Sequence, residues 1–168
     1  MAMIVSAVTG NFTTPPELTK TYDCDTTSST DCLLQYAEKY GFEGVSIGAK
    51  YGLHYSSSNE QIKQAINQYF DDGYILIVSG VIGNPSFDNA TRNPFSSSGH
   101  YVVLYGRDSN GKWLIADPGG TNRDWAPECT AINSCKAHDN AMDPDQLIEN
   151  GVRRYTGSDV QAFGFKKK

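Results

Sequence analysis

The sequence predicts an α+β fold in which helices come early in the chain and strands come late. Three observations lead to this class: helix-capping patterns in the first half, a continuous apolar run at 74–79, and a strand–turn–strand pattern over 98–118. The chain has 168 residues, of which 39% are hydrophobic and 20% charged, as in ordinary globular proteins. We therefore expect residues 1–168 to form a single domain.

Helices are predicted where a capping pattern or a closing glycine frames an apolar stripe. The clearest is the capping box Ser58-Asn59-Glu60-Gln61, which opens a helix that ends at Gly73. Its apolar face consists of Ile62, Ala65, Ile66 and Tyr69. We expect further helices over residues 1–8 (closed by Gly10), 14–20, 30–40 (capped by Ser29 or Thr30 and closed by Gly41) and 143–150 (closed by Gly151).

Strands are predicted from apolar or alternating runs bounded by turn residues. The run Tyr74-Ile75-Leu76-Ile77-Val78-Ser79 is almost continuously apolar, so we expect a strand that is buried on both faces. Further strands are expected over residues 44–47, 98–106, 113–118 and 160–165, and irregular structure over 83–98 and 118–140.

The predicted hairpin carries a histidine near its beginning and an aspartate near its end. Because side chains alternate along a strand, His100 shares a face with Val102 and Leu104, and Asp117 shares a face with Ile115. An imidazole oriented by a carboxylate is a common arrangement for a general base beside a nucleophile. His100 and Asp117 are therefore the predicted catalytic residues.

The length of the turn decides how close these two side chains lie. A four-residue connection over 108–111 places Asp117 opposite Val102 and diagonal to His100, where a side-chain hydrogen bond is within reach. A two-residue Asn110-Gly111 turn keeps both on one face but moves Asp117 further away. The sequence leaves both registers open.

The hairpin also carries a family likeness. Gly99-His100-Tyr101-Val102-Val103-Leu104, with Gly106 and the stretch from Gly111 to Pro118, resembles the His–Asp half of papain-like cysteine peptidases. The closest type is the bacteriocin-processing, double-glycine peptidases and their stand-alone relatives. The resemblance extends in order of elements over residues 1–118. It implies a bacterial protein with a papain-like fold, in which N-terminal helices pack on a small antiparallel sheet, and it implies no cofactor and no metal.

The family's nucleophile is absent from the expected place. In such proteins a cysteine in a Cys-Gly-Pro-type motif opens the first helix, and an oxyanion-hole glutamine stands upstream of it. Residues 1–8 resemble the body of that helix, so we expect the cysteine upstream of Met1 and the domain to lack the start of its first helix. Cys24 lies between acidic residues, which disfavour a thiolate, and Cys32 has no basic neighbour.

Two functions follow from the resemblance. The first is a cysteine peptidase-like hydrolase of peptide or amide bonds, with His100 as base and Asp117 as its orienter, acting on a leader peptide or a cell-wall peptide. A transglutaminase-like or cell-wall amidase domain has the same residue pattern. The second is an inactive domain that binds a peptide or protein partner. The loop 84–98, with Phe87 and Phe95, and the segment 51–55 would then supply apolar contacts.

The four cysteines form two local pairs, Cys24 with Cys32 and Cys129 with Cys135, in polar, loop-like sequence. Short disulfide loops are typical of exported proteins, so we expect a secreted or cell-surface location. Four reduced thiols are the alternative. A zinc site at Cys129, Cys135 and His138 is a further one, although structural zinc sites usually have tighter cysteine spacing.

Charge and hydropathy exclude other classes. The net charge of −5 does not favour nucleic-acid binding, which depends on clustered Lys and Arg. The only basic run is Lys166-Lys167-Lys168, which we expect to be a solvated terminus or a junction. No apolar stretch approaches the roughly 20 residues that span a bilayer, so we expect no membrane span.

Overall fold

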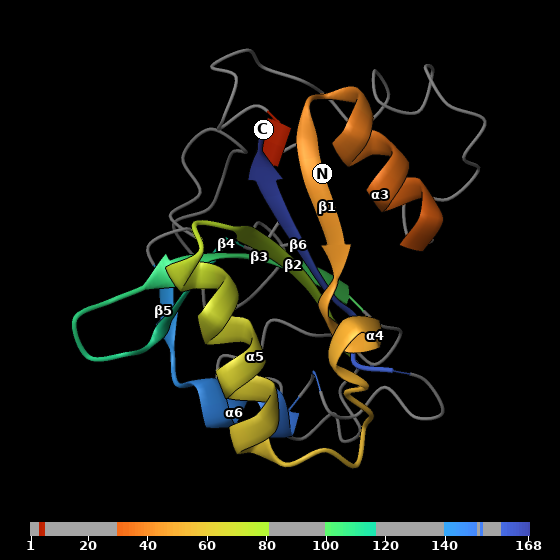
Figure 1. Ribbon diagram of the computed structural model, residues 1–168. Helices are drawn as coiled ribbons and strands as arrows, with labels where there is room; N and C mark the ends of the chain where they lie inside the picture. The colour runs from red at the N-terminus through yellow and green to blue at the C-terminus, as the bar shows by residue number, and fades with distance from the viewer. Residues whose placement is uncertain (1–3, 6–29, 81–99, 117–139, 151, 153–158) are drawn as a thin grey trace.

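The computed structural model describes residues 4–5, 30–80, 100–116, 140–150, 152 and 159–168 (Figure 1). The described helices are α3 (Thr30–Lys39), α4 (Ile47–Tyr51), α5 (Asn59–Asp71) and α6 (Pro144–Asn150). The described strands are β1 (Phe42–Ser46), β2 (Ile75–Gly80), β3 (His100–Arg107), β4 (Trp113–Ala116), β5 (Asn140–Met142) and β6 (Ala162–Lys167).

The six strands form one antiparallel sheet in the order β1-β6-β2-β3-β4-β5. Strand β6, near the end of the chain, lies between β1 and β2, so the last strand joins the first two. The central pair β2–β3 runs in register from Leu76↔Leu104 to Gly80↔His100. A mixed helical and antiparallel-sheet architecture confirms the coarse α+β prediction.

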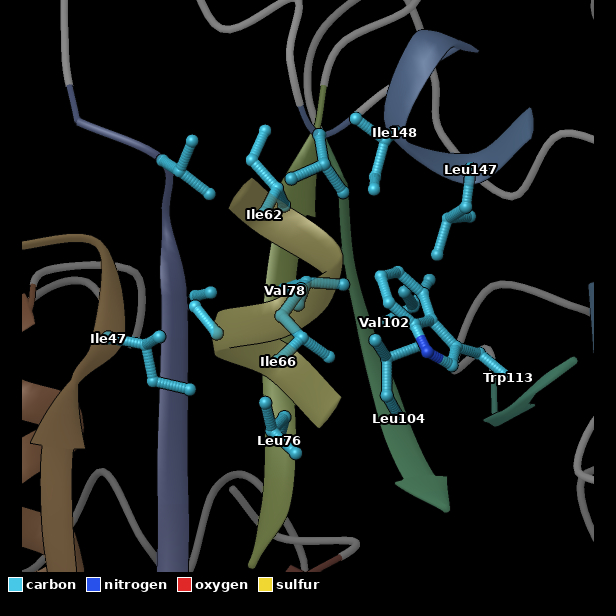
Figure 2. Packing of buried hydrophobic residues seen from close by; sticks show 14 of the residues in the cluster. Ile47, Ile62, Ile66, Leu76, Val78, Val102, Leu104, Trp113, Leu147 and Ile148 are labelled. Atoms are coloured by element: carbon cyan, nitrogen blue, oxygen red, sulfur yellow. The ribbon is translucent and has the colours of Figure 1, made fainter. Parts of the chain in front are cut away.

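Both faces of the sheet are covered, and the apolar side chains divide into two clusters. The first cluster lies between the sheet and the helices α4, α5 and α6, and Figure 2 shows Ile62 and Ile66 of α5 over Val78 of β2. The second cluster lies on the opposite face, where Leu33 and Ala37 of α3 meet the sheet. Successive residues of the central strands alternate between the clusters, as expected for a strand buried on both sides.

Helix α5 forms as its sequence predicts. The Ser58 backbone N–H donates to Gln61 Oε1 at 2.9 Å, and the Gln61 backbone N–H donates to Ser58 Oγ at 3.2 Å, which completes the capping box. The four residues of the predicted apolar face, Ile62, Ala65, Ile66 and Tyr69, are all buried. The helix ends just before Gly73, as predicted.

The predicted strand 44–47 is wrong at its end. Strand β1 covers Phe42–Ser46, and Ile47 instead begins the short helix α4, where it is fully buried. The chain turns here because α4 packs closely against Val160: a Cβ built on Gly48 would lie 1.8 Å from the Val160 carbonyl oxygen. Only a glycine allows this approach.

Three further expectations need correction. Strand β5 (Asn140–Met142) was not expected; it begins at Asn140, the last residue of the segment 118–140 that was expected to be irregular, and the rest of that segment lies outside the described residues. Strand β6 begins at Ala162 and not at residue 160, because the Ala162 N–H bonds back to the Val160 carbonyl at 3.0 Å. The strand runs on through Lys167, so most of the basic run pairs with β1 and is more than a solvated terminus, although its side chains remain exposed.

Several expected elements lie wholly or partly outside the described residues. They include the helix 14–20, the loop 83–98 and most of the helix 1–8, of which Ile4 and Val5 are described as helical and are each 1% exposed. Both belong to the second cluster. These two residues therefore pack on the face of the sheet that α3 covers.

We predict that Gly48→Ala destabilises the protein strongly, by about 3 kcal/mol or more, because the new methyl group meets backbone that cannot swing aside. Gly52→Ala is the matched control: Gly52 has φ of +59° but open space around it, so we expect only about 1 kcal/mol. Urea unfolding measures both. Equal losses in the two variants would show that the contact with Val160 does not limit position 48.

Tyr74 joins the end of α5 to β1. Its hydroxyl donates to Glu43 Oε1 at 2.8 Å, and its ring meets the Tyr69 ring at 4.9 Å in an edge-on arrangement. Desolvation, with the hydrogen bond to Glu43 second, raises the pKa of Tyr74 to about 12 from the usual 10.0. The folded protein therefore holds this proton more tightly than the unfolded chain does.

It follows that the stabilisation linked to Tyr74 is complete below about pH 10 and is lost as the pH rises through about 12. We predict that the free energy of unfolding falls more steeply over this window in the natural protein than in Tyr74→Phe. Urea titrations of both proteins at several pH values test this, since every other group titrates in both. Parallel curves would rule out the raised pKa.

Candidate active site

His100 is the first residue of β3 and lies opposite Gly80, the last residue of β2. It is partly buried. Val102 and Leu104 belong to the first cluster, so strand alternation assigns His100 to the same face, as predicted. Tyr101 packs against the second cluster on the other face. The predicted base thus stands at the end of the sheet where β3 begins and β2 ends.

The turn between β3 and β4 differs from both predicted connections. It covers five residues, 108–112, because Arg107 pairs with Trp113. Asp108 closes it: its N–H donates to the Lys112 carbonyl at 2.9 Å, and its Oδ1 accepts from the N–H groups of Asn110 and Lys112. Next to the turn, Arg107 therefore pairs with Trp113, whereas the predicted four-residue turn would have paired it with Lys112.

A β-bulge restores that register further along. The pairing shifts between Leu104 and Gly106, after which Leu104 faces Ile115 and Val103 faces Ala116. This is the pairing in which the four-residue turn was expected to put Asp117 opposite Val102. Asp117 follows Ala116 directly but lies outside the described residues. Its approach to His100 stays a prediction.

A polar link that sequence reasoning missed fixes the beginning of β3. The Tyr101 hydroxyl donates to Gln161 Oε1 at 3.0 Å. It spans β2 to do so, since Ser79 lies between them: Ser79 pairs with Tyr101 in the sheet, and its N–H donates to the Gln161 carbonyl at 2.9 Å. These three residues connect the adjoining ends of β3, β2 and β6 beside His100. In the sequence, the only indication of this link is that two polar residues, Ser79 and Gln161, stand within or next to apolar strand sequence.

The second described histidine, His54, stands apart from this link. It forms an isolated β-bridge with Asp159, and its Nδ1 lies 3.3 Å from Ser56 Oγ. Its ring centre lies 4.1 Å from that of Tyr55, with the two rings tilted by 54°. Tyr51 and Tyr55, two residues of the segment expected to contact a peptide, are each 42% exposed. Phe87 and Phe95 fall outside the described residues.

Cys32 is the only cysteine in the part of the chain that the structure describes. It is 8% exposed on α3 and is held in a disulfide, so it offers no free thiol. Its partner falls outside the described ranges, and the pairings Cys24–Cys32 and Cys129–Cys135 remain predictions. The proposed alternative zinc ligands Cys129, Cys135 and His138 also fall outside them. The described residues contain no cluster of three His, Cys, Asp or Glu side chains suited to a metal.

Comparison with protein families decides the wider assignment. The profile of the Peptidase_C39 like family matches residues 1–138, most of the 168-residue chain. The chain belongs to this family. Membership in the Peptidase_C39 like family confirms the resemblance and supports a peptidase-like function with peptide binding in general terms. The matched range contains both His100 and Asp117. No curated protein and no solved structure matches the chain.

No described helix has the length and the apolar character needed to cross a membrane.

The link at Ser79 gives a paired test. Ser79 is 1% exposed and its hydroxyl has no hydrogen-bond partner among the described residues, so Ser79→Ala should leave stability unchanged or raise it by about 1 kcal/mol. Tyr101→Phe removes the donor to Gln161 and should cost about 1 kcal/mol. Urea unfolding of both variants checks the signs. A clear loss of stability in Ser79→Ala would mean that its hydroxyl has a partner after all.

Proposed function

We propose that the chain is the His–Asp part of a papain-like cysteine peptidase or amidase, with His100 as the general base and Asp117 as the residue that orients it. The observation that carries this proposal is the pairing Val103↔Ala116 after the bulge. Of the two registers that the sequence leaves open, it is the one that brings a carboxylate at position 117 closer to an imidazole at position 100. The matched family supports the class of reaction.

The proposed chemistry follows from these roles. One ring nitrogen of His100 takes the proton from a cysteine thiol, and the thiolate attacks the carbonyl carbon of a peptide or amide bond. The imidazolium then gives its proton to the leaving amine as the C–N bond breaks. Water, deprotonated by His100, hydrolyses the resulting thioester and restores the thiol. Asp117 accepts a hydrogen bond from the other ring nitrogen, which fixes the tautomer and stabilises the positive charge.

The nucleophile in this proposal is a cysteine thiol at the start of the catalytic helix, as the family resemblance implies. Cys32 is unsuitable because its sulfur is in a disulfide and buried. That disulfide also supports our proposal that the protein is exported. The substrate in this proposal is a leader peptide or a cell-wall peptide.

A second function is binding without cleavage. It is favoured by one observation: within the described ranges there is no free thiol to pair with His100. In that case the surface around His100, where β3 begins, binds a peptide or a partner protein without cleaving it.

The test joins a helix bearing a Cys-Gly-Pro motif ahead of Met1 and follows peptide cleavage by mass spectrometry. We expect cleavage that falls at least about a hundredfold in His100→Ala and less steeply in Asp117→Asn. His54→Ala is the matched histidine control and should retain cleavage.

Unchanged turnover in His100→Ala would remove the assigned base. Equal losses in His100→Ala and His54→Ala would point to general damage to the fold. Peptide binding seen by NMR without cleavage in the extended chain would favour the second function.

A further inference from the structure

The surface between α4 and α5 forms a shallow groove of about 280 Å³. Its lining consists of Tyr51, Leu53, Gln61, Gln64, Ala65 and Gln68. None of these side chains is charged, although a fifth of all residues in the chain are. The polar groups of the lining are therefore three neutral amides and one phenol.

The three glutamines form one stripe along α5. They stand at positions i, i+3 and i+7, a spacing that puts them on the same side of a helix. Leu53 and Ala65, each 5% exposed, form the apolar part of the lining. A ligand in this groove meets amide groups along its whole length.

Internal hydrogen bonds give each amide a defined role. Gln61 Oε1 accepts from the Ser58 N–H at 2.9 Å and from Ser58 Oγ at 3.1 Å, which leaves its NH₂ group as a donor. Gln68 Oε1 accepts from the Tyr51 hydroxyl at 3.0 Å, so its NH₂ group is likewise a donor. Both donors are fixed before any ligand arrives.

The middle amide has the opposite role. Gln64 Nε2 uses one of its two N–H donors on Glu60 Oε1 at 3.3 Å, and Gln64 Oε1 is available as an acceptor. The stripe thus presents donor, acceptor and donor in order along the helix. This alternation complements a ligand whose own groups both donate and accept, as hydroxyl groups do.

Tyr51 adds an aromatic surface beside this stripe. Its hydroxyl is tied to Gln68, and its ring meets the Tyr69 ring at 6.2 Å and 89°. It nevertheless remains 42% exposed. A held but exposed ring offers apolar contact area at little entropic cost, and it suits the C–H face of a sugar ring.

From these features we infer that the groove between α4 and α5 binds a neutral oligosaccharide, whose hydroxyl groups pair with Gln61, Gln64 and Gln68 while one sugar ring packs on Tyr51. A peptide, whose backbone also donates and accepts hydrogen bonds, is the alternative occupant; the exposed ring of Tyr51 beside the amide stripe favours the sugar. The inference involves neither His100 nor Asp117, so it stands or falls independently of the proposed function.

The test uses the chain itself, labelled with ¹⁵N, and follows the side-chain NH₂ signals of glutamine by NMR. Cellotetraose, maltotetraose and chitotetraose are titrated separately to millimolar concentration, with an uncharged glycine–serine tetrapeptide as the peptide arm. We expect at least one tetrasaccharide to shift the signals of Gln61 and Gln68, and the peptide to shift neither.

Nearly isosteric variants remove the NH₂ donors of the glutamines and keep the hydrogen bonds that support the fold. Gln68→Glu keeps an oxygen that accepts from Tyr51 but replaces the NH₂ donor, and Gln61→Glu likewise preserves the helix cap. Each should weaken sugar binding about fivefold to tenfold, the effect of one lost hydrogen bond. Gln146→Glu, on exposed α6 surface outside the groove, adds the same charge and should leave binding unchanged.

Three outcomes would overturn the inference. The first is no shift with any tetrasaccharide. The second is a shift with the tetrapeptide alone, which would assign the groove to peptides. The third is equal weakening by Gln68→Glu and Gln146→Glu, which would reflect net charge and not the amide stripe.

Discussion

The central constraint on this fold is that β2 and β3 are buried on both faces. Leu76 and Val78 of β2 face the helices α5 and α6, while Ile77 between them faces α3. A slip of one residue would exchange the two sets of side chains and disrupt both clusters at once. The pairing of His100 with Gly80 is therefore fixed by the core. The position of the candidate base at the start of β3 is therefore set by the packing of apolar side chains that do not take part in the proposed chemistry.

The sequence predicts those elements whose signals are local. Helix α5 carries its capping box, its apolar face and its closing glycine within sixteen residues, 58–73, and forms accordingly. Strand β2 is long and apolar enough to be unambiguous. Helix α4 could not be predicted, because it depends on the approach of Gly48 to Val160, far away in sequence. Strand β5 has only three residues and owes its conformation to its neighbour β4.

The candidate site likewise combines features that the sequence predicts with features that depend on distant contacts. The face shared by His100 and Val102 follows from strand alternation, which the sequence reveals. The hairpin register does not, because a longer turn and the bulge near Tyr105 shift the pairing in opposite directions and cancel. The bond from Tyr101 to Gln161 depends on the last strand inserting beside β2, a long-range choice that no local pattern encodes.

The two clusters also restrict how a nucleophile can reach His100. Ile4 and Val5 pack on the face of Tyr101 and Val103, whereas alternation assigns His100 to the opposite face. The buried sheet separates these two faces. In the proposed mechanism the thiol and the imidazole therefore meet where β3 begins and β2 ends. The proposed mechanism needs these strand ends to be held in place, and the bond from Tyr101 across β2 to Gln161 links them one residue from the proposed base.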